Sequence, residues 1–106
     1  MQVFSHCLYE FQKGVRRLVL LTLEIYELNN IISRLEKEKI PYHFQYLKNK
    51  KANLYFGDEY CVQVAKMFGK KPLNELSTEE DFILGIMLGY DLKQQCSRYI
   101  SKKTTP

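Results

Sequence analysis

Residues 42–56 read Tyr-His-Phe-Gln-Tyr-Leu-Lys-Asn-Lys-Lys-Ala-Asn-Leu-Tyr-Phe, and this stretch decides the fold. Aromatic residues occupy every second position at its start, which predicts a half-exposed strand over residues 42–47. The polar run Lys48–Lys51 predicts a turn, and Ala52–Phe56 predicts the returning strand. The stretch is therefore a β-hairpin, and the remaining elements are placed around it.

Two helices and one strand are predicted before the hairpin. The run Arg17–Leu23 is short, apolar and rich in branched side chains, which indicates a strand covered on both faces. Residues 24–39 have apolar side chains at helical spacing and charged ones opposite, and Pro41 ends this helix. Residues 3–12 have the spacing of a short amphipathic helix, which Gly14 terminates.

Two further helices are predicted after the hairpin. Asp58 is suited to the N-cap of the first, which ends at Gly69. Ser77 and Glu80 have the S-x-x-E spacing of a capping box, in which each side chain satisfies a free backbone N–H of the other. This last helix is expected to be the longest and to continue to about Tyr99.

The resulting order is helix, strand, helix, strand, strand, helix, helix, which predicts an α+β fold. Its middle is a three-stranded sheet in a β-α-β-β-α core, a split β-α-β unit of ferredoxin type without the fourth strand. An N-terminal helix and a long C-terminal helix are added to it. The length of 106 residues predicts one domain over residues 1–100 and a flexible polar tail over 101–106.

The charge pattern favours protein partners over nucleic acid or membrane. Sixteen basic and twelve acidic residues give a net charge of +4, which favours an acidic partner through salt-dependent attraction. The basic residues are not concentrated in one segment, so no specific nucleic-acid binding is predicted. No apolar run approaches the roughly 20 residues of a membrane span. Met1–Leu8 lacks a signal-peptide pattern, so we expect a cytoplasmic location.

No catalytic residue, metal site or cofactor is predicted. Cys7, Cys61 and Cys96 are widely spaced, and only two histidines are present, so no zinc-ligand pattern exists. The odd cysteine count without an export signal indicates reduced thiols. The chain also lacks nucleophile-elbow, metalloprotease and phosphate-loop motifs.

The last predicted helix suggests an interface. Residues 82–90 leave almost no polar face, and a helix that is apolar all round must be covered on several sides. Two glycines four residues apart on one helix face indicate the close approach of another backbone. Packing against the protein's own sheet and contact with a second molecule both explain this pattern. The interface candidates are Phe82, Gly85, Ile86, Gly89 and Tyr90.

The most recognisable motifs are Glu-Glu-Asp-Phe-Ile-Leu-Gly at 79–85 and Gly-Tyr-Asp at 89–91, with supporting segments at 6–20, 54–57 and 95–99. With these motifs, nearly the whole chain resembles a family of small bacterial proteins of unknown function. The resemblance implies a three-stranded α+β fold, a homodimer, and genes that often neighbour a flavodoxin gene. It implies no activity, and Cys7 stands where the family usually has a second histidine.

Two functional hypotheses follow. The first is a non-enzymatic, dimeric accessory protein that binds flavodoxin or another acidic redox protein, and the resemblance favours it. The second is a small ligand-binding domain or enzyme, with a pocket near His6, Tyr9, Asp91 and Cys96.

Overall fold

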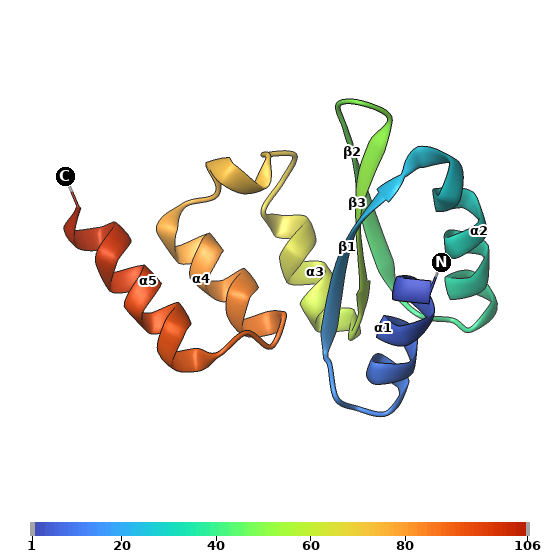
Figure 1. Ribbon diagram of the computed structural model, residues 1–106, viewed down its shortest axis with the longest axis horizontal. Coiled ribbons are helices and arrows are strands. Elements are labelled where there is room, and N and C mark those ends of the chain that lie inside the picture. Colours follow the sequence, from blue (N-terminus) through green and yellow to red (C-terminus); the bar gives the residue numbers. More distant parts are fainter. Residues whose placement is uncertain (1, 106) are drawn as a thin grey trace.

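The computed structural model describes residues 2–105, in which a three-stranded antiparallel sheet separates two groups of helices (Figure 1). The predicted α+β fold and its β-α-β-β-α core are confirmed. The elements are α1 (Gln2–Gln12), β1 (Leu18–Glu24), α2 (Ile25–Lys37), β2 (Tyr42–Leu47), β3 (Lys51–Gly57), α3 (Glu59–Met67), a short 3-10 helix η1 (Leu73–Glu75), α4 (Thr78–Met87) and α5 (Leu92–Thr104).

Strand β3 is the centre of the sheet, whose order is β1-β3-β2. It runs antiparallel to both neighbours, with Leu54 opposite Leu21 on one side and Phe44 on the other. All of its residues after the first are buried. Successive side chains of a strand point to opposite faces, so Leu54 and Phe56 enter one core and Tyr55 enters the other.

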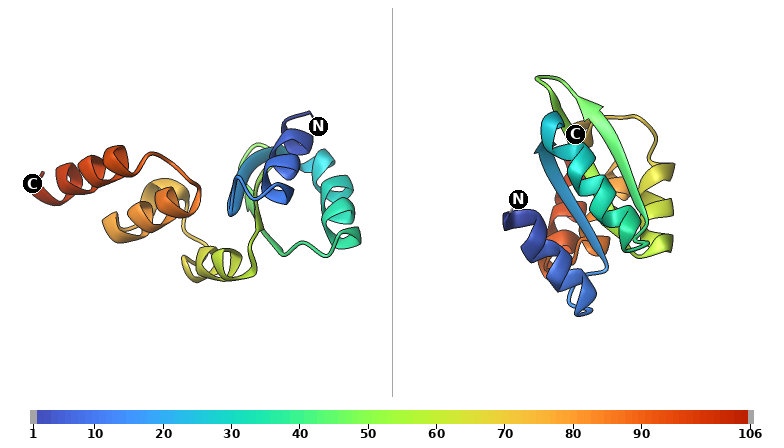
Figure 2. Two further views of the ribbon diagram at one scale, coloured as in Figure 1. Left: turned by 90° about the horizontal axis from the view of Figure 1, so that it is seen from below. Right: turned by 90° about the vertical axis from the view of Figure 1, so that its right-hand side faces the viewer.

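Helices α1 and α2 cover the first face of the sheet (Figure 2). Phe56 is fully buried there, and its ring lies 5.6 Å from that of Phe4 in an edge-to-face arrangement. The buried residues of α2 include Leu28 and Leu35, which confirms the helical spacing read from the sequence. This first core joins residues of α1, α2, β1 and β3.

Helix α3 and part of α4 cover the second face, while α5 lies farther out, against α4 (Figure 2). Only Leu84 and Leu88 of the α4 region are buried in this second core, and α5 has no buried residue. The molecule is therefore elongated, with extents of 45 × 32 × 23 Å. Its radius of gyration is 14.4 Å, against about 13 Å for a compact domain of this length.

The predicted single helix from Ser77 to Tyr99 is wrong, because the chain turns at Gly89. Gly89 has a φ of +82°, and its N–H donates to the Ile86 carbonyl at 3.0 Å. The Tyr90 N–H also donates a hydrogen bond to the Gly85 carbonyl, at 3.1 Å. The two hydrogen bonds and the positive φ of Gly89 together form a Schellman C-cap. Gly85 and Gly89 therefore do not share a helix face.

A new helix starts directly after this turn. The Asp91 carboxylate accepts a hydrogen bond from the Gln94 N–H at 3.0 Å and caps α5. Helix α5 continues to Thr104, so residues 101–104 of the expected polar tail are helical. No helix within residues 2–105 is long and apolar enough to cross a membrane.

The β2–β3 turn is shorter than the sequence indicates. Leu47 pairs with Lys51, so only three residues connect the strands. Asn49 and Lys50 both have φ near +60°, a conformation that matches the twist of hairpin strands. The Lys50 carbonyl accepts a hydrogen bond from the Ile25 N–H at 2.9 Å, which joins the turn to the start of α2.

Gly57 lies at the end of β3 against β1, where the backbone of β1 leaves no room for a side chain. Its φ is +143°, and a Cβ atom would lie 2.3 Å from the Arg17 carbonyl oxygen. That same oxygen accepts the Asp58 N–H at 2.8 Å. The close approach thus ties β1 to the strand that leads into α3.

We predict that Gly57→Ala lowers the free energy of unfolding by about 3 kcal/mol or more, because it combines a positive φ with a backbone clash. The matched control is Gly69→Ala, which has a φ of +78° but no atom within 4 Å of the added Cβ. It should cost only about 1 kcal/mol. Urea unfolding measures both, and equal losses would contradict the argument.

Candidate interaction surface

Helices α4 and α5 form a hairpin that several charge pairs connect. Asp81 receives hydrogen bonds from Arg98, at 2.8 Å from Nε and 3.2 Å from Nη2, and Lys102 Nζ lies 3.5 Å away. The Arg98 bonds hold the pKa of Asp81 below its usual value. Glu79 pairs with Lys103 and accepts a hydrogen bond from the Tyr99 hydroxyl at 3.0 Å. These pairs connect α4 to α5, and α5 itself has no buried residue.

The Gln95 side chain of α5 lies directly against Gly85 of α4. A Cβ atom on this residue would lie 2.0 Å from Oε1 of Gln95, so the glycine makes room for the amide of α5. On the other side of the contact, the Phe82 ring lies 5.3 Å from that of Tyr99. The atoms that approach Gly85 belong to the Gln95 side chain, so the close backbone approach predicted from the glycine spacing is not found there, and nothing lies within 4 Å of a Cβ at Gly89.

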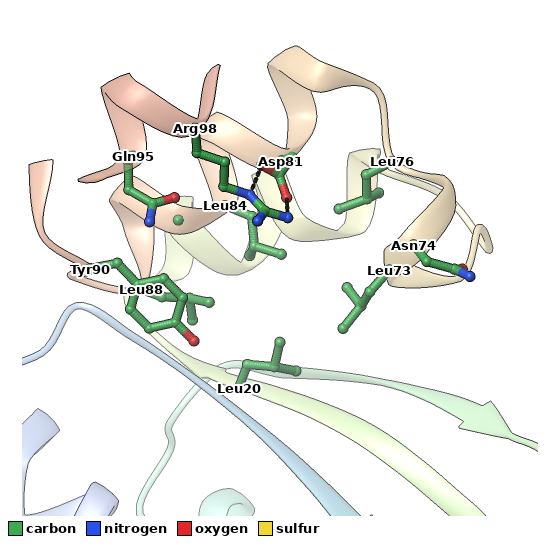
Figure 3. Close-up of a pocket in the computed structure, with 11 residues that line it drawn as sticks. Leu20, Leu73, Asn74, Leu76, Asp81, Leu84, Leu88, Tyr90, Gln95 and Arg98 are labelled. Atoms are coloured by element: carbon green, nitrogen blue, oxygen red, sulfur yellow. Dashed lines mark hydrogen bonds and ion pairs between the residues drawn. The ribbon is translucent and has the colours of Figure 1, made fainter. Parts of the chain in front are cut away.

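A cavity of about 470 Å³ separates the hairpin from the sheet (Figure 3). Leu20 of β1 forms one wall, and leucines of η1 and α4 form the opposite wall. The Asp81–Arg98 pair lies at the polar end, and the Tyr90 hydroxyl points toward the sheet. The two charged residues of the lining, Asp81 and Arg98, pair with each other, so the cavity combines one polar end with leucine walls.

A second, more apolar groove of about 460 Å³ lies between α4 and α5. Two of the residues lining it are strongly exposed, namely Ile83 at 41% and Ile100 at 60%. Nearby exposed apolar side chains extend this surface along the hairpin. We call the set the α4–α5 face: Phe82, Ile83, Ile86, Leu92, Tyr99 and Ile100.

The five interface candidates have different positions. Gly85 is buried by Gln95, and Phe82 is half-buried against Tyr99. Ile86 and Tyr90 are exposed at 39% and 57%. Gly89, also exposed, forms the turn between the helices. Three of the five therefore lie on accessible surface.

The four ligand-pocket candidates are not brought together. His6 and Tyr9 lie on α1, on the opposite side of the sheet from α5 (Figure 1). His6 lies 3.7 Å from Glu10, and Lys13 stands over the Tyr9 ring. Asp91 caps α5, as described above, and Cys96 lines the groove between α4 and α5. They do not line one pocket.

Two of the three cysteines lie in surroundings that affect their thiol chemistry. Burial raises the pKa of both Cys7 and Cys61, which disfavours the nucleophilic thiolate. Within residues 2–105, no three His, Cys, Asp or Glu side chains are grouped so as to hold a metal ion.

Sequence reasoning missed Arg98 and Gln95, which fix α5 on α4. Asp81 and Arg98 are seventeen residues apart, and no local spacing rule pairs them. The only available signal was Gly-Tyr-Asp at 89–91, a glycine stop followed by an N-cap residue. If that signal is read as a turn, the sequence predicts two shorter helices that pack against each other.

The fold and this surface define a small α+β protein with a projecting helical hairpin. The family model described as protein of unknown function DUF2023 matches residues 2–102, so the chain belongs to that family. The resemblance to a family of unknown function is thereby confirmed. No curated protein matches the chain.

We predict that Asp81→Asn lowers the free energy of unfolding at pH 7 by at most about 1 kcal/mol, since Arg98 is half-exposed. The pKa of Asp81 is lower in the folded state than its usual value of 3.8. The stabilisation that the Asp81 carboxylate gives the folded state is therefore fully present above pH 3.8 and is lost as the pH falls through the folded-state pKa. The difference between wild type and variant should therefore shrink in strong acid.

Urea unfolding at pH 7 and in strong acid measures this difference. Glu75→Gln is the matched control, because Glu75 is exposed and forms no ion pair with another described residue. It should change stability by less than about 0.5 kcal/mol. A variant difference that is the same at both pH values would contradict the assigned role of Asp81.

Proposed function

We propose that this protein is a non-enzymatic interaction protein that forms a homodimer through the α4–α5 face and binds an acidic redox partner. The observation that carries the proposal is α5 itself. It is a thirteen-residue helix with no buried residue, and it rests on α4 while apolar side chains stay exposed. Most helices of small domains instead bury an apolar stripe.

The large accessible surface area of the chain supports a partner that covers part of it. The chain exposes 7386 Å², whereas a compact monomer of 12.6 kDa exposes about 6,200 Å². The excess of about 1,200 Å² exceeds the ~800 Å² that each partner contributes to a standard interface. The exposed side chains of the α4–α5 face contribute to this surface.

The charge distribution favours a second copy as the occupant of that face. Residues 78–104 contain four acidic and four basic residues, so this segment has no net charge. Two copies can approach through it without net repulsion, and a C2 dimer presents the same patch from both molecules.

The remaining charge supports the acidic partner. Residues 1–77 contain twelve basic and eight acidic residues, so the whole net charge of +4 belongs to this part of the chain. Such a charge steers an acidic protein toward the sheet and its helices in a salt-dependent way. The flavodoxin gene neighbourhood implied by the resemblance makes flavodoxin the first partner to test, and a bacterial source belongs to the same proposal.

We predict that the double variant Ile83→Asp/Ile100→Asp dissociates the dimer. Burying two charges at apolar anchor positions should cost at least about 2 kcal/mol of association free energy, which is about 30-fold in the dissociation constant. Sedimentation equilibrium over a concentration series measures this constant. Circular dichroism verifies that the variant remains folded.

The matched control is Val15→Asp, an equally apolar and 70%-exposed position in the α1–β1 connection. It should leave the dimer intact. A wild-type protein that remains monomeric at millimolar concentration would refute the dimer. A dimer that survives Ile83→Asp/Ile100→Asp would place its interface elsewhere.

We also predict that purified flavodoxin binds at low ionic strength and that the dissociation constant rises at least about tenfold between 50 and 500 mM salt. Isothermal calorimetry at both salt concentrations measures this change. The homodimer should respond much less, because its proposed interface carries no net charge. Absence of binding at 50 mM salt would refute the partner, and salt-independent binding would refute the electrostatic argument.

A further inference from the structure

The outer edge of β2 has the features of a strand-pairing site. Within residues 2–105, β2 pairs with β3 on one side and with no strand on the other. Edge strands are commonly protected from pairing by a lysine, a proline or a bulge. Strand β2 contains no charged residue and no proline, and its register with β3 is unbroken from Tyr42 to Leu47.

The strand is also held rigidly on both faces. The His43 ring stacks on Tyr55 at 5.9 Å, and the Gln45 amide donates to the Lys70 carbonyl at 2.6 Å. On the opposite face, Phe44 packs against the first core and contacts Tyr46 edge-to-face at 5.2 Å. An edge that is already ordered loses little conformational entropy when a further strand is added.

A basic cavity of about 690 Å³ lies beside this edge. Its lining combines residues of β2 with Lys66 and Lys70 from the end of α3 and the segment after it. Neither of these lysines forms an ion pair with another described residue. Burial, together with the charge of Lys66, lowers the pKa of His43, so the two lysines supply the positive charge near neutral pH.

We propose that this edge binds an extended acidic segment of a partner protein, which adds a fourth strand to the sheet. The backbone of the segment pairs with β2, and acidic and apolar side chains alternate along it. The acidic side chains face Lys66 and Lys70, and the apolar side chains face Phe44 and Tyr46. A second copy fits less well, because β2 contains no carboxylate to offer these lysines. The inference rests on the proposed acidic partner and specifies where that partner docks.

The test uses a blocked heptapeptide of alternating valine and glutamate, titrated into ¹⁵N-labelled full-length protein. We expect amide shift changes centred on residues 42–47. Lys66→Glu/Lys70→Glu should weaken binding at least about fivefold. The matched control Lys37→Glu/Lys93→Glu reverses two exposed lysines elsewhere and should leave the affinity unchanged. Two peptide controls, one with lysine for glutamate and one N-methylated at its central residue, should bind weakly or not at all.

Three outcomes would overturn the inference. They are no shifts at residues 42–47 at 5 mM peptide, equal binding of the lysine peptide, and β2 shifts that depend on protein concentration alone, which would identify a second copy. Flavodoxin binding is measured with the same variants. Binding that survives Lys66→Glu/Lys70→Glu would refute the β2 site and leave the proposed function intact, whereas peptide binding without flavodoxin binding would refute only the flavodoxin partner.

Discussion

The structure depends on one strand that is covered on every side. Strand β3 pairs with a neighbour along both edges and has buried side chains on both faces. Because successive side chains of β3 point to opposite faces of the sheet, the helices pack in two separate cores, one on each face. The first face receives two complete amphipathic helices. The second receives α3 and only two buried leucines from the α4 region, so the hairpin α4–α5 projects beyond the sheet.

This unequal division separates a rigid part of the molecule from an adaptable one. The sheet and its first core contain the fully buried side chains, including Phe56, Ile31 and Leu35. The hairpin is secured by exposed ion pairs and by the close contact of Gly85 with Gln95. Exposed pairs stabilise weakly, and segments with few buried contacts open at lower free energy than the core. A surface of that kind can adjust its packing to a partner.

Local signals predicted most elements, because alternation, helical spacing and caps act within a few residues. The Asp58 cap and the Ser77–Glu80 capping box form as the sequence indicates. The prediction of a single C-terminal helix was wrong because it gave more weight to the uninterrupted apolar run than to the helix-ending signal of Gly89. The turn at Gly89 includes a hydrogen bond from the Tyr90 N–H to the Gly85 carbonyl. The pairing of Asp81 with Arg98, and the separation of His6 from Asp91, follow from how helices pack, which spacing along the chain does not encode.

The distribution of charge connects the two proposed contacts. All of the net positive charge belongs to residues 1–77, whereas the helical hairpin is neutral. Two copies that met through positively charged surfaces would repel each other. The neutral, apolar hairpin is therefore the part of the chain best suited to a symmetric contact. That contact would leave the sheet and its basic β2 edge accessible in both copies, and two such edges would attract an acidic protein more strongly than one. Neutrality at one end and excess charge at the other would thus allow one small chain to make the two chemically different contacts proposed here.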